Sequence, residues 1–144
     1  MTVANYNQIL TDMQLLIQTI SSIEDVTVEE SDVAFPALSK MCKANIRLVA
    51  SPMEVRVGQD YFSDVNLEID VLAVDLSSYA EAANMRNGIV RDVVTTIRDN
   101  ARSFSSDVES TITTNVAFEG GPVEDQGFVA IATVEVSVKV YENR

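Results

Sequence analysis

The chain has 144 residues, of which 47% are hydrophobic and 22% charged, and this composition fits one globular domain that folds without a metal or disulfide staple. It has no histidine, and Cys42 is its only cysteine, so catalytic triads, imidazole metal sites and intrachain disulfides are excluded. A net charge of −12 disfavours binding to the phosphates of nucleic acids. No apolar run approaches the length of a membrane span, so we expect the partners to be proteins.

The first predicted element is an amphipathic helix from about Ala4 to Ser22. Its apolar stripe recurs every three or four residues and consists of Tyr6, Ile9, Leu10, Met13, Leu16, Ile17, Ile20 and Ile23. The opposite face is polar but carries a single charge, Asp12, and such charge depletion is typical of interface cores. We therefore take Asn7, Gln14 and Gln18 as candidate interface residues, with a merely solvated face as the alternative.

Two short strands are predicted next. Val26 and Val28 begin a period-two pattern, and a second strand covers Val33–Leu38. Pro36 has no backbone N–H to donate to a neighbouring strand. It is therefore compatible only with an edge strand or with the first residues of a strand. Phe35 and Pro36 are therefore further candidates for a contact surface.

The following stretch predicts a hairpin. Cys42–Val49 and Met53–Val57 read as strands on either side of Ser51-Pro52, a dipeptide that marks a turn. Cys42 is interpreted as a small packing residue rather than a reactive thiol.

A central strand and a second helix come next. Val65–Val74 alternates apolar and polar residues and then becomes apolar on both faces, as in a strand that is half covered and then fully covered. Ser78 and Glu81 have the spacing of a capping box, which predicts a helix that begins there and runs to about Arg102.

Arg86 falls inside the apolar stripe of this second helix, where an unpaired buried cation would be costly. Two interpretations stay open: the side chain reaches water at the rim, or it pairs with an acid, which a neighbouring subunit can supply.

The chain closes with a predicted hairpin. Ser110–Phe118 is one strand, Glu119–Pro122 the turn, and Phe128–Tyr141 the other strand, whose 14 residues suggest that it projects beyond the sheet or bends. The whole chain, 1–144, is then a single α+β domain with a mainly antiparallel sheet, two helices packed on one face and a long C-terminal hairpin.

No motif points to catalysis. Glycine-rich phosphate loops are absent, and no hydroxyl has an evident base. Asp60 with Asp64, and Glu119 with Glu124 and Asp125, offer oxygen ligands for Ca²⁺ or Mg²⁺ but match no known calcium loop. We expect no enzyme, metal or cofactor, and we expect self-assembly through strand edges, with a charge-protected monomer as the alternative.

Four features stand in one order along nearly the whole chain: the opening helix, the Phe35-Pro36 segment before a strand, the strand Leu67–Val71 leading into the helix Tyr79–Ile97, and the closing strand from Gly127-Phe128 to Val140-Tyr141. This order resembles that of the small tail terminator, or tail completion, proteins of long-tailed bacteriophages and of related head–tail joining proteins. The acidic segment from Asp99 to Asp125 departs from the pattern.

The resemblance implies a structural virion protein, assembled in the host cytoplasm and not bound to membrane. Such proteins form a ring, usually of six subunits, that sits on the head-proximal end of the tail tube, stops its growth and joins it to neck proteins. Double-stranded DNA would pass through without specific binding, repelled by the acidic subunits. Arg86, Arg91, Arg98, Glu119, Glu124 and Asp125 are then candidate contact residues. A different neck or stopper ring, another oligomeric adaptor and, least favoured, a carboxylate- and metal-dependent enzyme are the alternatives.

Overall fold

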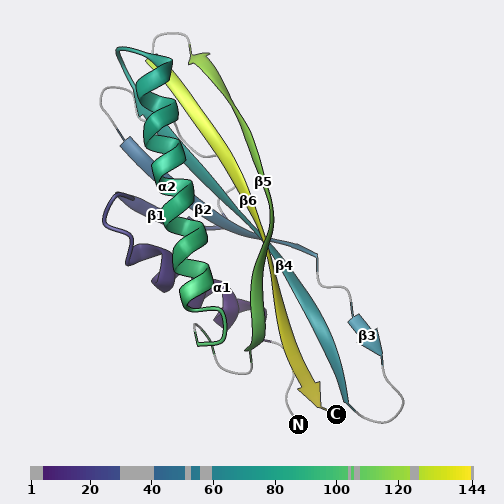
Figure 1. The fold of residues 1–144 in the computed structure, drawn as a ribbon. Helices are drawn as coiled ribbons and strands as arrows, with labels where there is room; N and C mark the ends of the chain where they lie inside the picture. Colours follow the sequence, from purple (N-terminus) through teal and green to yellow (C-terminus); the bar gives the residue numbers. More distant parts are fainter. Residues whose placement is uncertain are drawn as a thin grey trace.

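The protein is described by a computed structural model that covers residues 5–29, 41–50, 53–55, 60–103, 105, 108–123 and 127–143, with only the backbone for residues 41, 53–55, 60–62, 121–123 and 141–143. Phe35, Pro36, Glu124 and Asp125 lie outside the described residues, as does the predicted strand at 33–38. The elements in chain order are α1 (Tyr6–Gln18), β1 (Asp25–Val28), β2 (Met41–Ala50), β3 (Met53–Val55), β4 (Asp60–Asp75), α2 (Tyr79–Asp99), β5 (Val108–Val123) and β6 (Gly127–Asn143) (Figure 1).

The six strands form one sheet in the order β1-β2-β4-β6-β5, with β3 paired to β4. All pairs are antiparallel except β1 with β2. Together with the two helices this confirms the predicted α+β fold with a mainly antiparallel sheet, and the long hairpin of β5 and β6 closes it. In Figure 1 the long strands twist strongly about one another, as right-handed strand twist requires.

Helix α1 is shorter than predicted. Asn5 caps its start by accepting a hydrogen bond from the Gln8 N–H at 3.0 Å. At its end the Thr19 hydroxyl donates to the Leu16 carbonyl at 2.6 Å, and the helix stops. Ile20 and Ile23 remain buried beyond the helix, so the apolar stripe continues into the connection to β1.

The predicted hairpin of the second and third strands is wrong. β2 pairs with residues 66–74 of β4, and β3 pairs with residues 61–63 of the same strand, both antiparallel. Two strands antiparallel to one partner run in the same direction, whereas a hairpin needs a reversal. Within β2, Cys42 is buried as predicted, and burial together with the charge of Glu24 raises the pKa of its thiol.

The central strands are β4 and β6. They pair without a break from Asp60↔Asn143 to Asp75↔Phe128. The last strand therefore does not project beyond its neighbour, as one form of the prediction had it, because β4 is long enough to pair with it throughout. Near its end β4 buries Leu72 and Val74 in a small cluster with Val129, as expected for a strand covered on both faces.

The predicted turn at Glu119–Pro122 is also wrong, since β5 continues to Val123. A glycine pair and a proline indicated a turn, but an edge strand tolerates a proline because one side of it needs no ladder hydrogen bond. Gly120 has φ +148°, and a Cβ there would lie 2.4 Å from the Val129 carbonyl oxygen, so only glycine fits.

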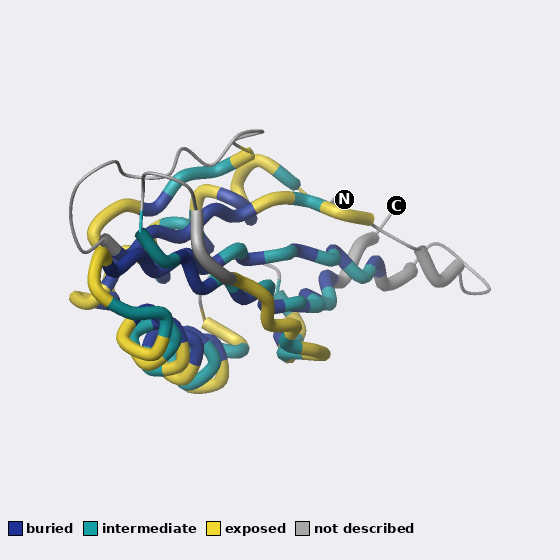
Figure 2. Tube along the Cα trace, turned by 90° about the horizontal axis from the view of Figure 1, so that it is seen from above, coloured by how far each residue is buried: buried dark blue, intermediate teal, exposed yellow. Residues whose placement is uncertain are grey.

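Helix α2 begins as predicted, with the Ser78 hydroxyl accepting from the Glu81 N–H at 3.0 Å. It ends at Asp99 rather than Arg102, and the side chain of the C-cap residue Asn100 donates to the Thr96 carbonyl at 2.8 Å. Both helices cover one face of the sheet and share one core, to which α1, α2, β2, β4 and β6 contribute residues such as Met13, Val93, Ile46, Ile69 and Val134. Figure 2 shows exposed residues on the outer side of the helical turns and buried residues toward the sheet.

Candidate assembly surface

The two edges of the sheet differ in length. β1 has four residues, whereas β5 has 16 and pairs only with β6 among the described strands. Beside this long edge Ile112 and Phe118 expose 59% and 54% of their surface. Register shifts between Val108 and Ser110 and between Thr113 and Asn115 interrupt the edge, as bulges often do where a protein limits strand addition. The β5 side is therefore a long edge on which two large apolar side chains, Ile112 and Phe118, are exposed.

At one end of the contact between α2 and β5 lies Arg86, which is only 8% exposed. Its Nη1 donates to the Tyr79 hydroxyl and to the Glu119 carbonyl, each at 3.2 Å, and its Nε donates to Asn87 Oδ1 at 3.1 Å. The guanidinium also lies 5.0 Å from the centre of the Phe118 ring, a cation–π distance. Neither interpretation from the sequence fits, because the cation is buried and held by neutral groups of its own chain.

At the other end α2 and β5 enclose an apolar groove of about 400 Å³. Its lining consists of Val94, Ile97, Arg98, Ala101, Thr111, Ile112 and Thr113. Thr111 is 3% exposed, and its hydroxyl has no hydrogen-bond partner among the described residues. A buried hydroxyl without a partner is costly, and the described residues have a second one in Ser63 of β4, but only Thr111 lies beside an open apolar groove.

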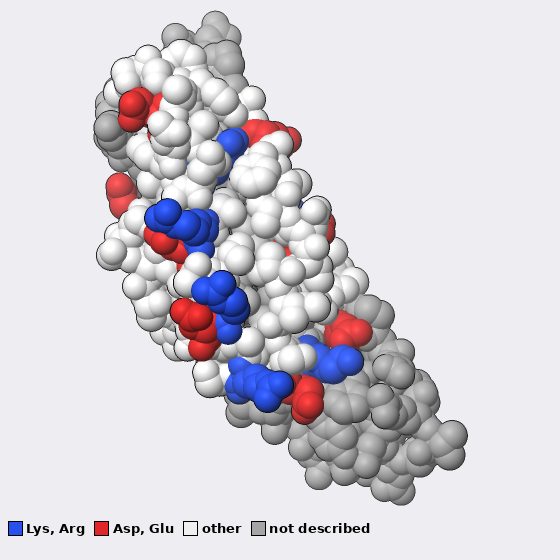
Figure 3. Space-filling model, viewed as in Figure 1, with Lys and Arg blue, Asp and Glu red and all other residues white. Residues whose placement is uncertain are grey.

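Arg91 and Arg98 are exposed on the outer surface of α2, seven residues apart and therefore on one side of the helix. Their nearest acids are their own neighbours in sequence, Asp92 at 3.9 Å and Asp99 at 3.6 Å, and such exposed pairs contribute little. Figure 3 shows Lys and Arg side chains following α2, each close to Asp or Glu. Three bases and three acids make this helix neutral in a chain of net charge −12.

The polar face of α1 divides into two parts. Asn7 and Gln18 are exposed, whereas Gln14 is half-buried and donates to the Val26 carbonyl at 3.0 Å, which ties the helix to β1. The exposed Leu15 was not among the predicted interface residues. A leucine that departs from the apolar stripe was the signal that could have identified it.

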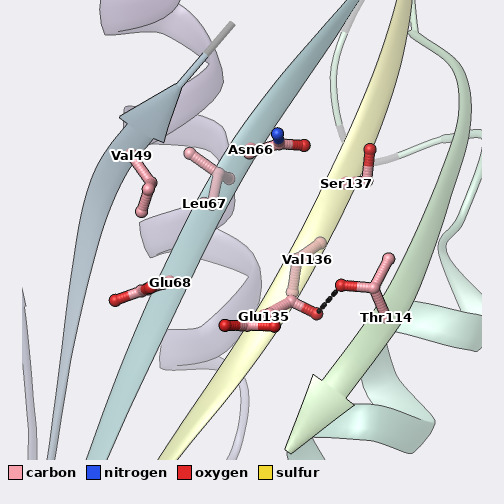
Figure 4. Close-up of a pocket in the computed structure, with 8 residues that line it drawn as sticks. All are labelled: Val49, Asn66, Leu67, Glu68, Thr114, Glu135, Val136 and Ser137. Atoms are coloured by element: carbon pink, nitrogen blue, oxygen red, sulfur yellow. Dashed lines mark hydrogen bonds between the residues drawn. The ribbon is translucent and has the colours of Figure 1, made fainter. Parts of the chain in front are cut away.

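The face of the sheet opposite the helices has a hollow of about 320 Å³ (Figure 4). Glu68 of β4 and Glu135 of β6 stand directly opposite each other in the register and both line it. Thr114 of β5 donates to the Glu135 carbonyl at 3.3 Å, the contact dashed in Figure 4. The carboxylates of two residues on neighbouring central strands thus line the same hollow.

One arginine neutralises part of this face. Arg47 forms ion pairs with Glu68 and, at 2.9 Å, with Asp70, and the Asp70 hydrogen bond raises the pKa of its guanidinium. Thr133 donates to the other Asp70 oxygen at 2.9 Å. These contacts cross β2, β4 and β6, so they fasten the strands to one another.

Within the described residues, no helix is long and apolar enough to cross a membrane. The same residues contain no group of three or more Cys, Asp or Glu side chains arranged to hold a metal ion.

Of the residues singled out from the sequence, the structure brings Arg86 and Glu119 together, through the Glu119 backbone carbonyl rather than its carboxylate. Asn7, Gln18, Arg91 and Arg98 are exposed and lie apart on the two helices. Sequence reasoning did not single out Thr111 or Ile112.

No protein-family model matches this chain, and no curated protein matches it in sequence. A solved structure with 12% sequence identity matches with a TM-score of 0.45 over 95% of this chain and 94% of its own. The name of that protein states no function.

Proposed function

We propose that this chain is a structural virion subunit that forms a ring, with six copies as the expected number, at the head-proximal end of a phage tail. There it ends the growth of the tail tube and joins the tail to the neck. The order of elements along the chain suggests this role. The observation that carries it is the long outer side of β5, with exposed Ile112 and Phe118 beside it.

A closed ring needs two different surfaces on each subunit, because a surface that meets its own copy produces a two-fold dimer. The sheet supplies two opposite sides. One is formed by β5 and α2, with Ile112 and Phe118 exposed. The other is formed by β1 and α1, where Leu15 is the exposed apolar side chain. Head-to-tail packing of these two sides gives a ring.

Charge favours the same orientation. Asp12, Glu24, Asp25 and Glu29 lie in or beside α1 and β1, which carry no base, whereas α2 and β5 together carry three bases and five acids and expose Arg91 and Arg98. Packing the acidic side of one subunit against the acidic side of another would be repulsive, and packing it against α2 avoids this. Charge thus selects the head-to-tail arrangement more than it adds affinity.

The acidic character also suits a channel for DNA. A net charge of −12 on each subunit disfavours adhesion of phosphates, although salt at physiological strength screens this beyond about 8 Å. We therefore expect DNA to pass the subunits without binding to them specifically.

The mass of the purified protein tests the proposal. We expect a particle of six times the 15.8 kDa subunit mass by native mass spectrometry, rings by negative-stain electron microscopy, and binding to the ends of isolated tail tubes. Ile112→Asp should reduce the mass to that of a monomer. Val49→Asp is the matched control, because Val49 is 53% exposed but lies on β2, away from β5. A protein that stays monomeric at high concentration and binds no tube end contradicts the proposal.

A further inference from the structure

The groove between α2 and β5 has the properties of a site that an apolar segment completes. Its lining is mostly apolar, Ile112 in that lining is more than half exposed, and the Thr111 hydroxyl is buried with no hydrogen-bond partner in the described part of the chain. A folded subunit rarely leaves such a hydroxyl unbonded, and a peptide backbone that enters the groove can supply the missing hydrogen bond. The occupant we expect is therefore extended and apolar.

The groove also has a cationic rim. Arg98 lines it, and Arg91 lies two turns earlier on the same side of α2. Both side chains are exposed, with only weak pairs to their sequence neighbours. An acidic residue next to the apolar segment would meet these two arginines, which adds charge complementarity to the fit.

We propose that the groove takes residues 32–38 of a neighbouring copy, an inference that rests on the ring proposed above. This segment reads Asp-Val-Ala-Phe-Pro-Ala-Leu and follows the acids Glu29 and Glu30. It joins a run of six apolar or proline residues to a cluster of acids. The sequence analysis predicts an extended strand for the same residues.

Chain length assigns the segment to a neighbour rather than to the same subunit. Residues 30–40 connect β1 with β2, whereas β5 lies at the opposite edge, four strand positions from β1. Four strand spacings span roughly 19 Å. A connection of eleven residues that starts at β1 and must return to β2 can extend at most about 20 Å away from them. If it reached β5, no residues would be left to lie in the groove. In a head-to-tail ring, by contrast, the β1 side of one copy faces the β5 side of the next.

Disulfide formation between two single variants tests this contact. In a Cys42→Ala background, one protein carries Phe35→Cys and the other Ile112→Cys. When the two are mixed, allowed to exchange subunits and oxidised, we expect a non-reducing gel to show a shift from one subunit mass to two. Neither variant alone should give this band. A mixture of Phe35→Cys with Val49→Cys is the matched control and should not give it either.

The outcomes separate this inference from the proposed function. Rings without the Phe35–Ile112 crosslink, or with equal crosslinking at Val49, overturn the groove contact but leave the ring intact. A wild-type protein that is monomeric by native mass overturns the ring itself. As a second readout, Phe35→Asp should dissociate the ring while thermal unfolding of the subunit stays unchanged. A ring that survives Phe35→Asp also contradicts the contact.

Discussion

The two ends of the contact between α2 and β5 differ in how the space between helix and strand is filled. At one end Arg86 fills the space, with Tyr79, the Glu119 carbonyl and the Phe118 ring around its guanidinium. At the other end Thr111 is buried beside an open apolar groove, and no described residue bonds to its hydroxyl. One helix and one strand thus form a contact that is complete within the subunit at one end and incomplete at the other. The first end stabilises the subunit, and the second is the end that we propose for assembly.

The largest effect on stability should come from Arg86→Glu. This change places a buried carboxylate against a carbonyl oxygen and a ring face, both of which repel it, so we expect a loss of about 3 kcal/mol in the free energy of unfolding, measured by urea denaturation. Arg98→Glu on the exposed surface should change it by no more than about 0.5 kcal/mol. Equal losses in the two variants would remove the distinction between the two ends.

This difference also decides which arginine can report on assembly. Reversing Arg86 to separate subunits is a poor test, because its side chain lies inside its own chain and the variant loses stability whether or not a ring forms. Arg98→Glu keeps the subunit folded. A loss of ring mass in that variant would therefore reflect the contact itself.

A smaller effect should follow truncation of the two exposed apolar residues. Phe118→Ala removes the ring that lies over Arg86, and we expect a loss of about 1 kcal/mol in subunit stability. Ile112→Ala should cost the isolated subunit less than about 0.5 kcal/mol, since its side chain is more than half exposed. Chemical unfolding at a protein concentration low enough to keep subunits apart measures both. A greater loss from Ile112→Ala would assign it to the core.

The smallest effect concerns the unpartnered hydroxyl. Thr111→Val replaces it with a methyl group of similar shape, so the isolated subunit should be unchanged or more stable by up to about 1 kcal/mol. The ring should instead become weaker, because the neighbour's hydrogen bond is lost. Thermal unfolding of the monomer and the dissociation concentration of the ring measure the two effects. A destabilised monomer would show that the hydroxyl has a partner inside the subunit.

Much of the fold follows from local patterns. The burial of Ile9, Met13 and Ile17, the Ser78 cap and the alternation along β4 and β6 all follow from spacing that the sequence displays directly. Pairing is less local. Ser51-Pro52 suggested a reversal, but β2 and β3 both pair with β4, a choice that depends on a strand later in the chain.

The candidate assembly surface was harder to predict, because β5 changes its register. Before the shift between Thr113 and Asn115, Thr111 faces inward, and after it Val116 packs against the core, so odd and even positions exchange sides. In a strand without a register shift, Ile112 and Val116 would lie on the same face. The alternation in the sequence therefore predicts that Ile112 is buried together with Val116, and not exposed. The environment of Arg86 was equally inaccessible, since Glu119 lies 33 residues away along the chain.

The position of β6 has a consequence for biosynthesis. It follows the other described strands in sequence, yet it lies between β4 and β5 and pairs with both along its length. Until the residues of β6 have left the ribosome, β5 has no strand to pair with, and one edge of β4 has unpaired backbone groups. The sheet is therefore completed only after translation of β6, and a nascent chain halted before Gly127 leaves β5 detached and prone to aggregate.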